Sequence, residues 1–344
     1  MKKFCCYLMV LIGLVFTGSA QVIPFDFNGQ RVMPGTKTSF FITVPAGGDS
    51  VQLPFTVIHG KKTGPVIGLM AGVHGYEYPP ILALQALPGY IDPALLTGTV
   101  VILHLANVPA FLGRSVYYNP IDGKNLNRSF PGHKTGTITD KIAWFIAHDY
   151  FRYCNYLIDV HGGDASEDLH PYVGYYRNGP AADLSQQLAV VSGYDWLIAA
   201  DLPPKAGEAT LYAGREAAMQ GIPSITIEHG KLGIPDKAVA EVIQQRLLNM
   251  MRYLKLLPGE VVAANQPMTI TGRASIKSED SGIIKTDKKS GDLVRKGMKL
   301  AAITDLTGKH LRDITAPVDG VIIYMLATPP VNKGETLFSF GILP

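Results

Sequence analysis

The stretch Val66–Glu77, VIGLMAGVHGYE, begins as a short apolar run and ends in a loop that carries a histidine and a glutamate. A short apolar run bounded by glycine is typical of a buried strand. Ligands of open α/β sheets bind beyond the carboxyl ends of the strands. The stretch therefore predicts a strand that brings His74 and Glu77 to the edge of a sheet, where both side chains can face one ion.

Apolar runs and segments of helical periodicity alternate around this stretch, from about residue 36 to residue 257. Strands are expected at residues 66–71, 100–105, 156–160 and 224–227, and helices at residues 79–87, 137–151, 183–191, 214–220 and 238–256. Strands that alternate with helices indicate an α/β sheet with helices on both faces.

The pattern changes after the last of these helices. Pro258-Gly259 ends the helix, and residues 258–268 are expected to form a linker. Residues 269–344 contain short β-type runs separated by glycine-rich turns, which predict a small all-β domain. This segment resembles biotinyl/lipoyl-type domains, but Lys299 does not lie at a hairpin tip between acidic and methionine residues. A covalent carrier role is therefore disfavoured, and a rim that narrows access to the site is favoured.

The N-terminus has the anatomy of a secretory signal peptide. Lys2 and Lys3 precede the apolar run Cys5–Phe16, and Gly18–Ala20 supplies the small residues of a cleavage site. The run is shorter than the roughly 17–25 residues that span a bilayer. We expect residues 1–20 to be removed, the catalytic domain to occupy residues 21–257, and the protein to be exported to the periplasm or secreted without a stable membrane anchor.

Charge and cysteine content exclude several classes of protein. The formal net charge is +3, and two of these charges lie in the expected signal peptide. Such a balance excludes a polybasic surface for nucleic acid. Of the three cysteines only Cys154 lies beyond residue 20, so the mature chain contains no intrachain disulfide and depends on its core for stability.

A second histidine follows another expected strand. Asp159-Val160-His161-Gly162-Gly163 ends the run at residues 156–160, 84 residues beyond Glu77. A catalytic zinc ion takes three nitrogen or oxygen ligands from the protein and keeps one position open for water. A single histidine at a strand end is more often structural, but two of them together with Glu77 favour a His₂Glu site for one zinc ion. Asp159 is either an orienting partner of His161 or a cap of the strand.

Two further segments supply groups that suit amide hydrolysis. Residues 122–132 form a loop that presents Asn127 beside Arg128, and an arginine fork binds a carboxylate bidentately. Glu228 stands at the end of the strand expected at residues 224–227. Taken alone, such a glutamate is more often a salt-bridged surface residue. Beside a zinc ion, its carboxylate can accept a proton from water and deliver it to a leaving amine.

Taken together, these motifs resemble the succinylglutamate desuccinylase/aspartoacylase family, the deacylase branch of the zinc carboxypeptidase fold. The motifs occur in order as Gly-x-His-Gly-x-Glu, Asp-Gly-x-x-Leu-Asn-Arg-x-Phe-Pro-Gly, Asp-x-His-Gly-Gly and Thr-x-Glu-x-Gly, and the resemblance covers roughly residues 50–344. It implies a mixed sheet with helices on both faces, followed by the small β-domain. It also implies the following roles: zinc ligands His74, Glu77 and His161; general acid/base Glu228; and substrate-carboxylate ligands Asn127 and Arg128.

The resemblance also implies an arginine that polarises the scissile carbonyl, for which Arg114 is the nearest candidate. Candidates for specificity are Tyr175, Tyr176, Tyr212 and Arg215. We therefore expect a zinc-dependent amidohydrolase that removes an acyl group from an N-acylated amino acid or a similar small, carboxylate-bearing amide. The alternatives are a zinc carboxypeptidase acting on peptides, including cell-wall peptides, and a metal-free protein that only captures carboxylates.

Overall fold

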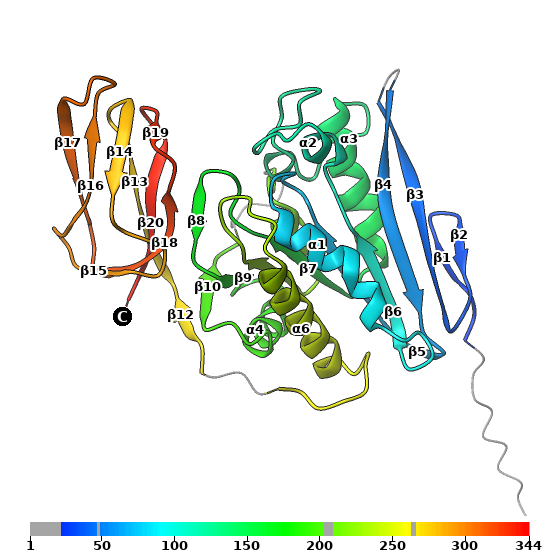
Figure 1. Ribbon diagram of the computed structural model, residues 1–344. Coiled ribbons are helices and arrows are strands. Elements are labelled where there is room, and N and C mark those ends of the chain that lie inside the picture. The colour runs from blue at the N-terminus through cyan, green and yellow to red at the C-terminus, as the bar shows by residue number, and fades with distance from the viewer. Residues whose placement is uncertain (1–21, 47–48, 203–208, 263–265, 344) are drawn as a thin grey trace, which may run out of the picture.

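The computed structural model describes residues 22–46, 49–202, 209–262 and 266–343, and Figure 1 shows how their elements are arranged. The expected signal peptide at residues 1–20 lies outside the described residues. Within the part of the chain that is described, no helix combines the length and the apolar composition that a membrane crossing requires.

A mixed nine-stranded sheet forms the centre of the larger part of the molecule. Its strand order is β12-β10-β9-β11-β7-β5-β6-β4-β3. The strands are β3 (Thr36–Ala46), β4 (Asp49–His59), β5 (Lys62–Ala71), β6 (Thr97–Leu103), β7 (Tyr156–His161), β9 (Tyr172–Tyr176), β10 (Trp196–Ala200), β11 (Ser224–Glu228) and β12 (Met268–Ile270). The inner strands β11, β7, β5 and β6 run parallel, whereas β9 is antiparallel to β11 and β4 is antiparallel to β6.

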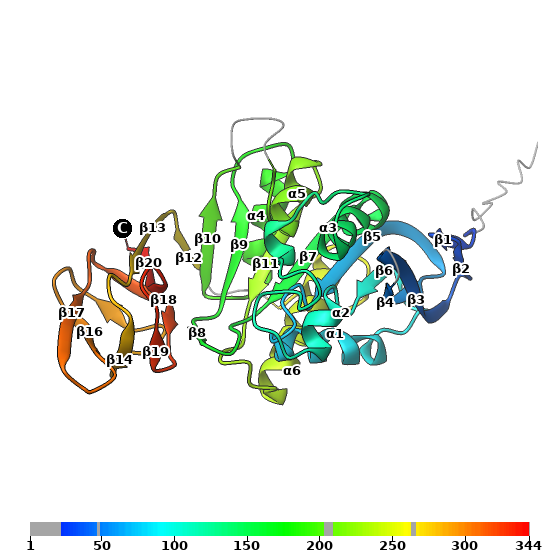
Figure 2. The same ribbon diagram turned by 90° about the horizontal axis from the view of Figure 1, so that it is seen from above.

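Helices cover both faces of this sheet, as Figure 2 shows from above. One apolar core lies under α1 (Tyr78–Ala86), α4 (Ala182–Val191) and α6 (Lys237–Tyr253), and a second lies under α3 (Ile138–Trp144) and α5 (Ala213–Met219). The short α2 (Val108–Leu112) follows β6. The predicted α/β class with helices on both faces is confirmed.

The helix expected at residues 137–151 changes its pitch within that range. A capping box between Thr137 and Asp140 starts α3, as the sequence indicates. The chain then continues as a π-helix at Phe145–Tyr150 and as a 3₁₀ turn at Phe151–Tyr153. The buried Tyr150 hydroxyl lies 3.0 Å from the carbonyl oxygens of both Leu69 and Val101, so this segment is fastened to two sheet strands.

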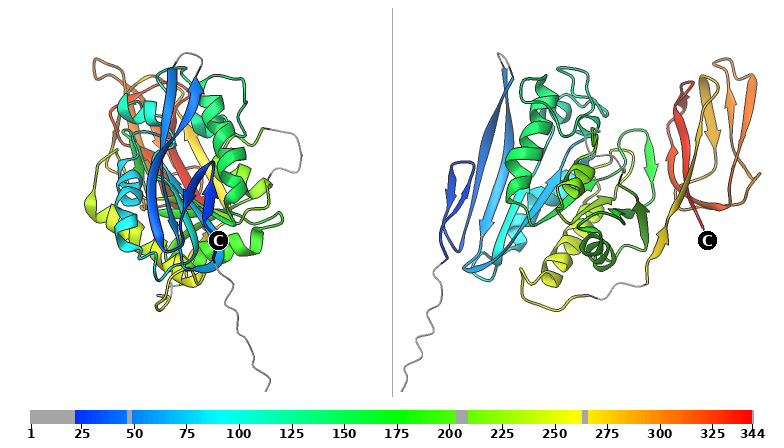
Figure 3. Two further views of the ribbon diagram at one scale, coloured as in Figure 1. Left: turned by 90° about the vertical axis from the view of Figure 1, so that its right-hand side faces the viewer. Right: turned by 180° about the vertical axis from the view of Figure 1, so that it is seen from behind.

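The C-terminal residues form two small sheets that pack around an apolar core of their own. One sheet has the order β13-β20-β18-β15, and the other has the order β17-β16-β14-β19. Their strands are β13 (Gly272–Lys277), β14 (Gly282–Thr286), β15 (Leu293–Val294), β16 (Lys299–Thr304), β17 (His310–Thr315), β18 (Gly320–Leu326), β19 (Pro330–Val331) and β20 (Thr336–Ile342). A small all-β region therefore follows the α/β part, as expected, and the right-hand view of Figure 3 shows it at one end of the molecule.

Two strand pairings connect the parts. Strand β8 (Glu167–Leu169), which lies only six residues beyond His161 in the sequence, pairs antiparallel with β18 of the C-terminal sheet. In return, β12 adds to the edge of the nine-stranded sheet by pairing with β10. The wall of the C-terminal sheet is therefore held beside the ends of β7 and β11. The exact domain boundaries given in the sequence analysis stay a prediction.

Candidate active site

Three side chains, two of them three residues apart and the third 84 residues further along the chain, meet at the ends of β5 and β7. The Nδ1 atom of His74 lies 2.6 Å from Oε1 of Glu77, and the Nδ1 atom of His161 lies 3.0 Å from Oε2 of the same carboxylate. One ligand atom from each residue lies within 4.8 Å of the others, and all three residues are buried. This spacing allows all three side chains to coordinate one metal ion.

The far nitrogens of both imidazoles face oxygen acceptors. Nε2 of His74 lies 3.2 Å from Oδ1 of Asn125, and Nε2 of His161 is in ion-pair contact with Oδ2 of Asp159 at 3.0 Å, although not aligned as a hydrogen bond. An acceptor beside Nε2 favours the tautomer that leaves the Nδ1 lone pair free for a metal. The three residues and their outer partners therefore fit the His₂Glu ligand set of a zinc ion.

Glycines give the backbone room to bring these ligands together. Gly72 leaves the end of β5 with a φ of +67°, a conformation that turns the chain toward His74 and that other residues rarely adopt. Directly after His161, a Cβ atom at Gly162 would lie 2.6 Å from the carbonyl oxygen of His229. The backbone N–H of Gly162 also donates to Glu77 over 3.3 Å.

The charges of the three residues depend on each other. Burial alone would raise the pKa of Glu77, but the neighbouring His161 and His74 lower it to about 2. Burial would lower the pKa of His161, and the carboxylates of Asp159 and Glu77 instead raise it well above the ordinary value. A metal ion at this point would replace the protons as the positive charge that stabilises Glu77.

Glu228 lies directly beside this group. It is the last residue of β11, and its register partner on the parallel strand β7 is His161. Burial, followed by the negative charges of Glu77 and Glu167, raises its pKa to about 8, although His161 acts in the opposite direction. A carboxyl group whose pKa lies near neutrality can accept and release a proton during a reaction.

Asn127 and Arg128 lie on a short 3₁₀ turn (Leu126–Arg128) on the other side of the histidines. The Oδ1 atom of Asn127 accepts from the backbone N–H of Ala213 over 3.1 Å, which leaves its amide NH₂ group as the available donor. The guanidinium of Arg128 is exposed and lies over the ring of Tyr212, 4.6 Å from its centroid. Both residues line the same cavity as the three candidate ligands.

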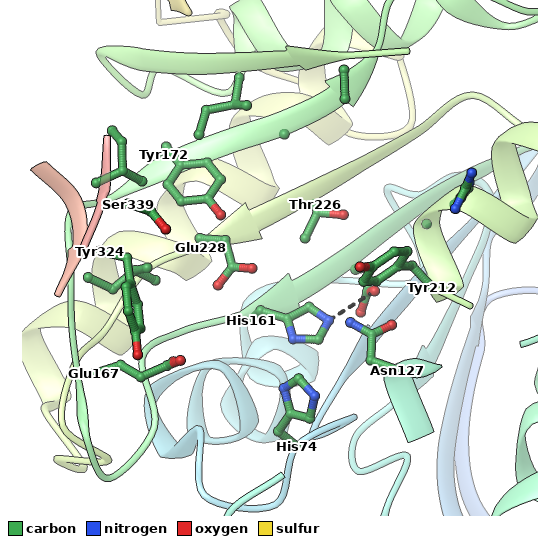
Figure 4. A pocket seen from close by; sticks show the side chains of 18 of the residues that line it. His74, Asn127, His161, Glu167, Tyr172, Tyr212, Thr226, Glu228, Tyr324 and Ser339 are labelled. Carbon is green, nitrogen blue, oxygen red and sulfur yellow. Dashed lines mark ion pairs between the residues drawn. The ribbon is translucent and has the colours of Figure 1, made fainter. Parts of the chain in front are cut away.

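This cavity has a volume of about 1020 Å³. In Figure 4, His74 and His161 lie between Asn127 and Tyr212 on one side and Glu167 and Tyr324 on the other. The C-terminal sheets supply part of the wall. Their contribution comprises Arg273, Ile323, Tyr324, Glu335, Thr336 and Ser339. The sequence favoured a C-terminal region that narrows access to the site, and residues of this region indeed line the cavity.

The remaining predicted residues divide into two groups. Arg114 lies outside the residues that line the cavity; it is exposed after the end of α2, with a φ of +49°. All four specificity candidates line the cavity, namely Tyr175, Tyr176, Tyr212 and Arg215. The Nε atom of Arg215 is buried without a hydrogen-bond partner.

Sequence reasoning assigned no role to the residues on the far side of the histidines. The Tyr117 hydroxyl donates to Oε1 of Glu167 over 2.6 Å, and the ring of Tyr117 stacks edge-on against His74 with 5.7 Å between centroids. Tyr324 reaches the same wall from β18. Glu167 follows the Asp-x-His-Gly-Gly motif closely enough for its position to be a usable signal, whereas Tyr117 and Tyr324 lie in unremarkable surroundings.

Comparison with known proteins agrees with this geometry. A family model described as the succinylglutamate desuccinylase/aspartoacylase catalytic domain matches residues 63–254. The chain is also 27% identical over 324 residues to an N-alpha-acetyl-L-2,4-diaminobutyric acid deacetylase of Halomonas elongata, and the match covers 91% of this chain and 92% of that protein.

Solved structures share the fold over nearly the full length. A succinylglutamate desuccinylase of Silicibacter sp. TM1040 superposes with a TM-score of 0.81 at 23% identity, over 90% of this chain and 95% of that one. The product-bound ectoine utilization protein EutE (DoeB) of Ruegeria pomeroyi superposes with a TM-score of 0.80 at 24% identity, over 89% and 95% of the two chains. These matches include the C-terminal sheets, so the two-part architecture is common to all three proteins.

Proposed function

Because this chain belongs to the succinylglutamate desuccinylase/aspartoacylase family and is therefore a hydrolase of acyl amides, we propose that it works with one zinc ion on N-acylated amino acids or similar small amides that carry a carboxylate. The observation that carries the proposal is the convergence of His74, Glu77 and His161 beside Glu228. When bound, zinc would supply a Lewis acid that makes water more acidic and a carbonyl carbon more electrophilic.

Glu228 is the proton carrier in this proposal. Its carboxylate takes the proton of the attacking water and then gives it to the nitrogen of the departing amine, which leaves as a neutral amine. Its raised pKa suits both steps, because a base whose pKa lies near the working pH is also a competent acid. Its placement in register with His161 brings the carboxylate to the same face of the sheet as the proposed metal ligands.

Arg128 and Asn127 anchor the carboxylate of the substrate. The guanidinium forms two parallel hydrogen bonds to a carboxylate, and the amide NH₂ of Asn127 adds a donor next to it. This anchoring fixes the scissile carbonyl relative to Glu228, and correct placement can supply several kcal/mol of the barrier reduction. We assign no role to Arg114, because it lies outside the cavity.

The proposal is tested by removing zinc with a chelator and restoring it. The purified protein is assayed with N-acetyl amino acids, with N-succinyl amino acids and with tetrapeptides, and the released amine is measured. We expect hydrolysis of N-acyl amino acids that disappears without metal and returns with one zinc ion per chain. Hydrolysis that survives metal removal would refute the zinc proposal, and cleavage of tetrapeptides alone would establish the carboxypeptidase alternative.

Export is a separate proposal that rests on residues 1–20. If these residues form a signal peptide, protein isolated from its native host begins at Gln21 and is found outside the cytoplasm. N-terminal sequencing that finds Met1 would overturn it.

A further inference from the structure

Arg128 and Glu167 line the cavity on opposite sides of the two histidines. Arg128 stacks on Tyr212, Asn125 contacts His74, and Tyr117 contacts both His74 and Glu167. Arg273 also reaches the cavity, from β13 near Tyr172. A substrate that extends from Arg128 past the histidines to Glu167 therefore meets a guanidinium at one end and a carboxyl group at the other.

A second carboxyl group, that of Asp164, adjoins Glu167 but lies outside the residues that line the cavity. Asp164 is fully buried, its backbone N–H donates to Oε2 of Glu167 over 3.2 Å, and neither of its own side-chain oxygens has a hydrogen-bond partner. Among the described residues, no lysine or arginine forms an ion pair with Asp164 or Glu167; the nearby Lys231 pairs with Asp168 instead, over 3.5 Å. Two neighbouring buried carboxyl groups without a cation are costly when both are ionised, so one of them holds a proton unless a ligand supplies positive charge.

Aromatic rings surround this acidic end. Tyr117, Tyr172 and Tyr324 line the cavity there, and the Tyr117 hydroxyl is held by Glu167. Figure 4 shows Tyr324 beside Glu167, with Tyr172 above them. The faces of aromatic rings attract cations, and an ammonium group is well bound where a carboxylate stands among such rings.

The direction of the substrate follows from the proposed function, on which this inference rests. If the carboxylate of the amine half is bound by Arg128 and the scissile carbonyl lies at the histidines, the acyl half must extend away from Arg128. That direction leads to Glu167, Tyr117 and Tyr324. We propose that this end of the cavity binds an ammonium group on the acyl half of the substrate, so that the preferred substrates are amino acids acylated by an amino-substituted acyl group.

The proposal also predicts what the enzyme rejects. An anionic acyl group such as succinyl would place a carboxylate against Glu167, and like charges in a poorly hydrated site repel strongly. The volume of about 1020 Å³ leaves space for an acyl group larger than acetyl. Charge, rather than size, would therefore select the acyl group.

A panel of acyl derivatives of one amino acid tests this directly with the zinc-loaded enzyme. Glycyl, β-alanyl and 4-aminobutyryl derivatives carry the ammonium group at increasing distance, and propionyl, butyryl and pentanoyl derivatives are their neutral matches in length. Succinyl is the anionic member. We expect kcat/KM for the best ammonium derivative to exceed that of its neutral match by at least about 10-fold, as a desolvated charge pair allows, and succinyl to be the poorest substrate.

Glu167→Gln should reduce this preference to within about twofold, because the amide keeps the size of the side chain and removes its charge. Glu241→Gln, at an exposed position of α6 where the side chain pairs only with Lys237, is the matched control and should retain the preference. If Glu167→Gln does not fold, the comparison of acyl derivatives with the wild-type enzyme still tests whether an ammonium group on the acyl half is preferred. Binding of 4-aminobutyrate and of its neutral match pentanoate to the metal-free wild-type protein, measured by calorimetry, provides a readout independent of turnover.

Three results would overturn the inference: equal kcat/KM for ammonium and neutral derivatives, a preference for succinyl, or an unchanged preference in Glu167→Gln. These outcomes differ from failure of the proposed function, in which the zinc-loaded enzyme hydrolyses no member of the panel.

Discussion

Glu228 and His161 are register partners on the adjacent parallel strands β11 and β7, although 67 positions separate them in the chain. Partners in register point to the same face of a sheet, so the candidate proton carrier and a candidate metal ligand are placed by backbone pairing rather than by loop conformation. The relative position of these two side chains is therefore as rigid as the sheet itself, which suits a site that must hold its geometry closely.

Glu228→Gln should lower kcat by about 10²–10⁴ while leaving KM little changed, because glutamine keeps the size of the side chain but cannot carry the proton. Zinc content, measured by mass spectrometry of the metal, should equal that of the wild type. A variant that loses zinc together with activity would show that Glu228 supports the metal site rather than the proton transfer.

His161→Ala should lose most of its bound zinc, since two remaining protein ligands bind the ion poorly. The measurement is the zinc content after dialysis against a weak chelator, and we expect about one ion per chain in the wild type. His133→Ala is the control, because His133 is exposed and contacts only Thr135 through its ring. Retention of a full complement of zinc by His161→Ala would place the metal elsewhere.

Arg128→Ala should raise KM by about 10-fold to 100-fold, the range expected when a charged hydrogen-bonding partner is lost. It should also lower kcat to a smaller extent, because a loosely held substrate is poorly aligned with Glu228. Arg152→Ala is a close control, since its guanidinium stacks over Tyr153 at 4.9 Å, much as Arg128 does over Tyr212. If Arg128→Ala and Arg152→Ala have equal effects on KM and kcat, Arg128 does not bind the carboxylate of the substrate.

Asp164 provides a test based on pH. Burial and the charges of Glu167 and Glu77 raise its pKa to about 8 in the metal-free protein. Between about pH 4 and pH 8 the folded state then holds a proton that the unfolded state has lost, so the free energy of unfolding falls as the pH rises. Above about pH 8 Asp164 is ionised in both the folded and the unfolded state, and the folded state carries the full free-energy cost of the buried carboxylate.

Asp164→Asn removes this titration. Compared with the wild type, the metal-free variant should gain about 5 kcal/mol of stability at pH 8, about 1.4 kcal/mol for each unit by which the pKa is raised, and little at pH 4. Urea unfolding at both pH values, followed by circular dichroism, measures the difference. A variant whose advantage is the same at pH 4 and pH 8 would show that Asp164 is ionised throughout this range.

The fold class and the central group of residues could be predicted because their signals are local. Val66–Ala71 and the run before His161 are apolar strands that end in glycine-rich loops, so the sequence shows both the strands and the edge at which they deliver ligands. The hairpin of β3 and β4 was not individually predicted, because their solvent-facing residues interrupt the apolar runs.

The acidic end of the cavity had a weaker signal, namely the position of Glu167 shortly after the Asp-x-His-Gly-Gly motif. Glu167 and Tyr324 come together because β8 pairs with β18, and this pairing joins segments 157 positions apart. The same limitation affects Arg114, which was selected by its distance along the chain from Arg128 and which is not among the residues that line the cavity. Pairing of distant strands depends on tertiary packing, which single-sequence periodicity does not contain.

The reciprocal strand pairings also limit how this protein can be taken apart or recombined. A gene truncated after α6 would lose β12 from one sheet edge and leave β8 without its partner β18, and each exposed edge is a template for aggregation. Grafting the C-terminal sheets of a relative onto this chain would require exchanging β8 and the β10 edge along with them. The α/β part and the C-terminal sheets therefore have to be inherited or exchanged together. A change of acyl preference is reached more readily through point substitutions than through domain exchange.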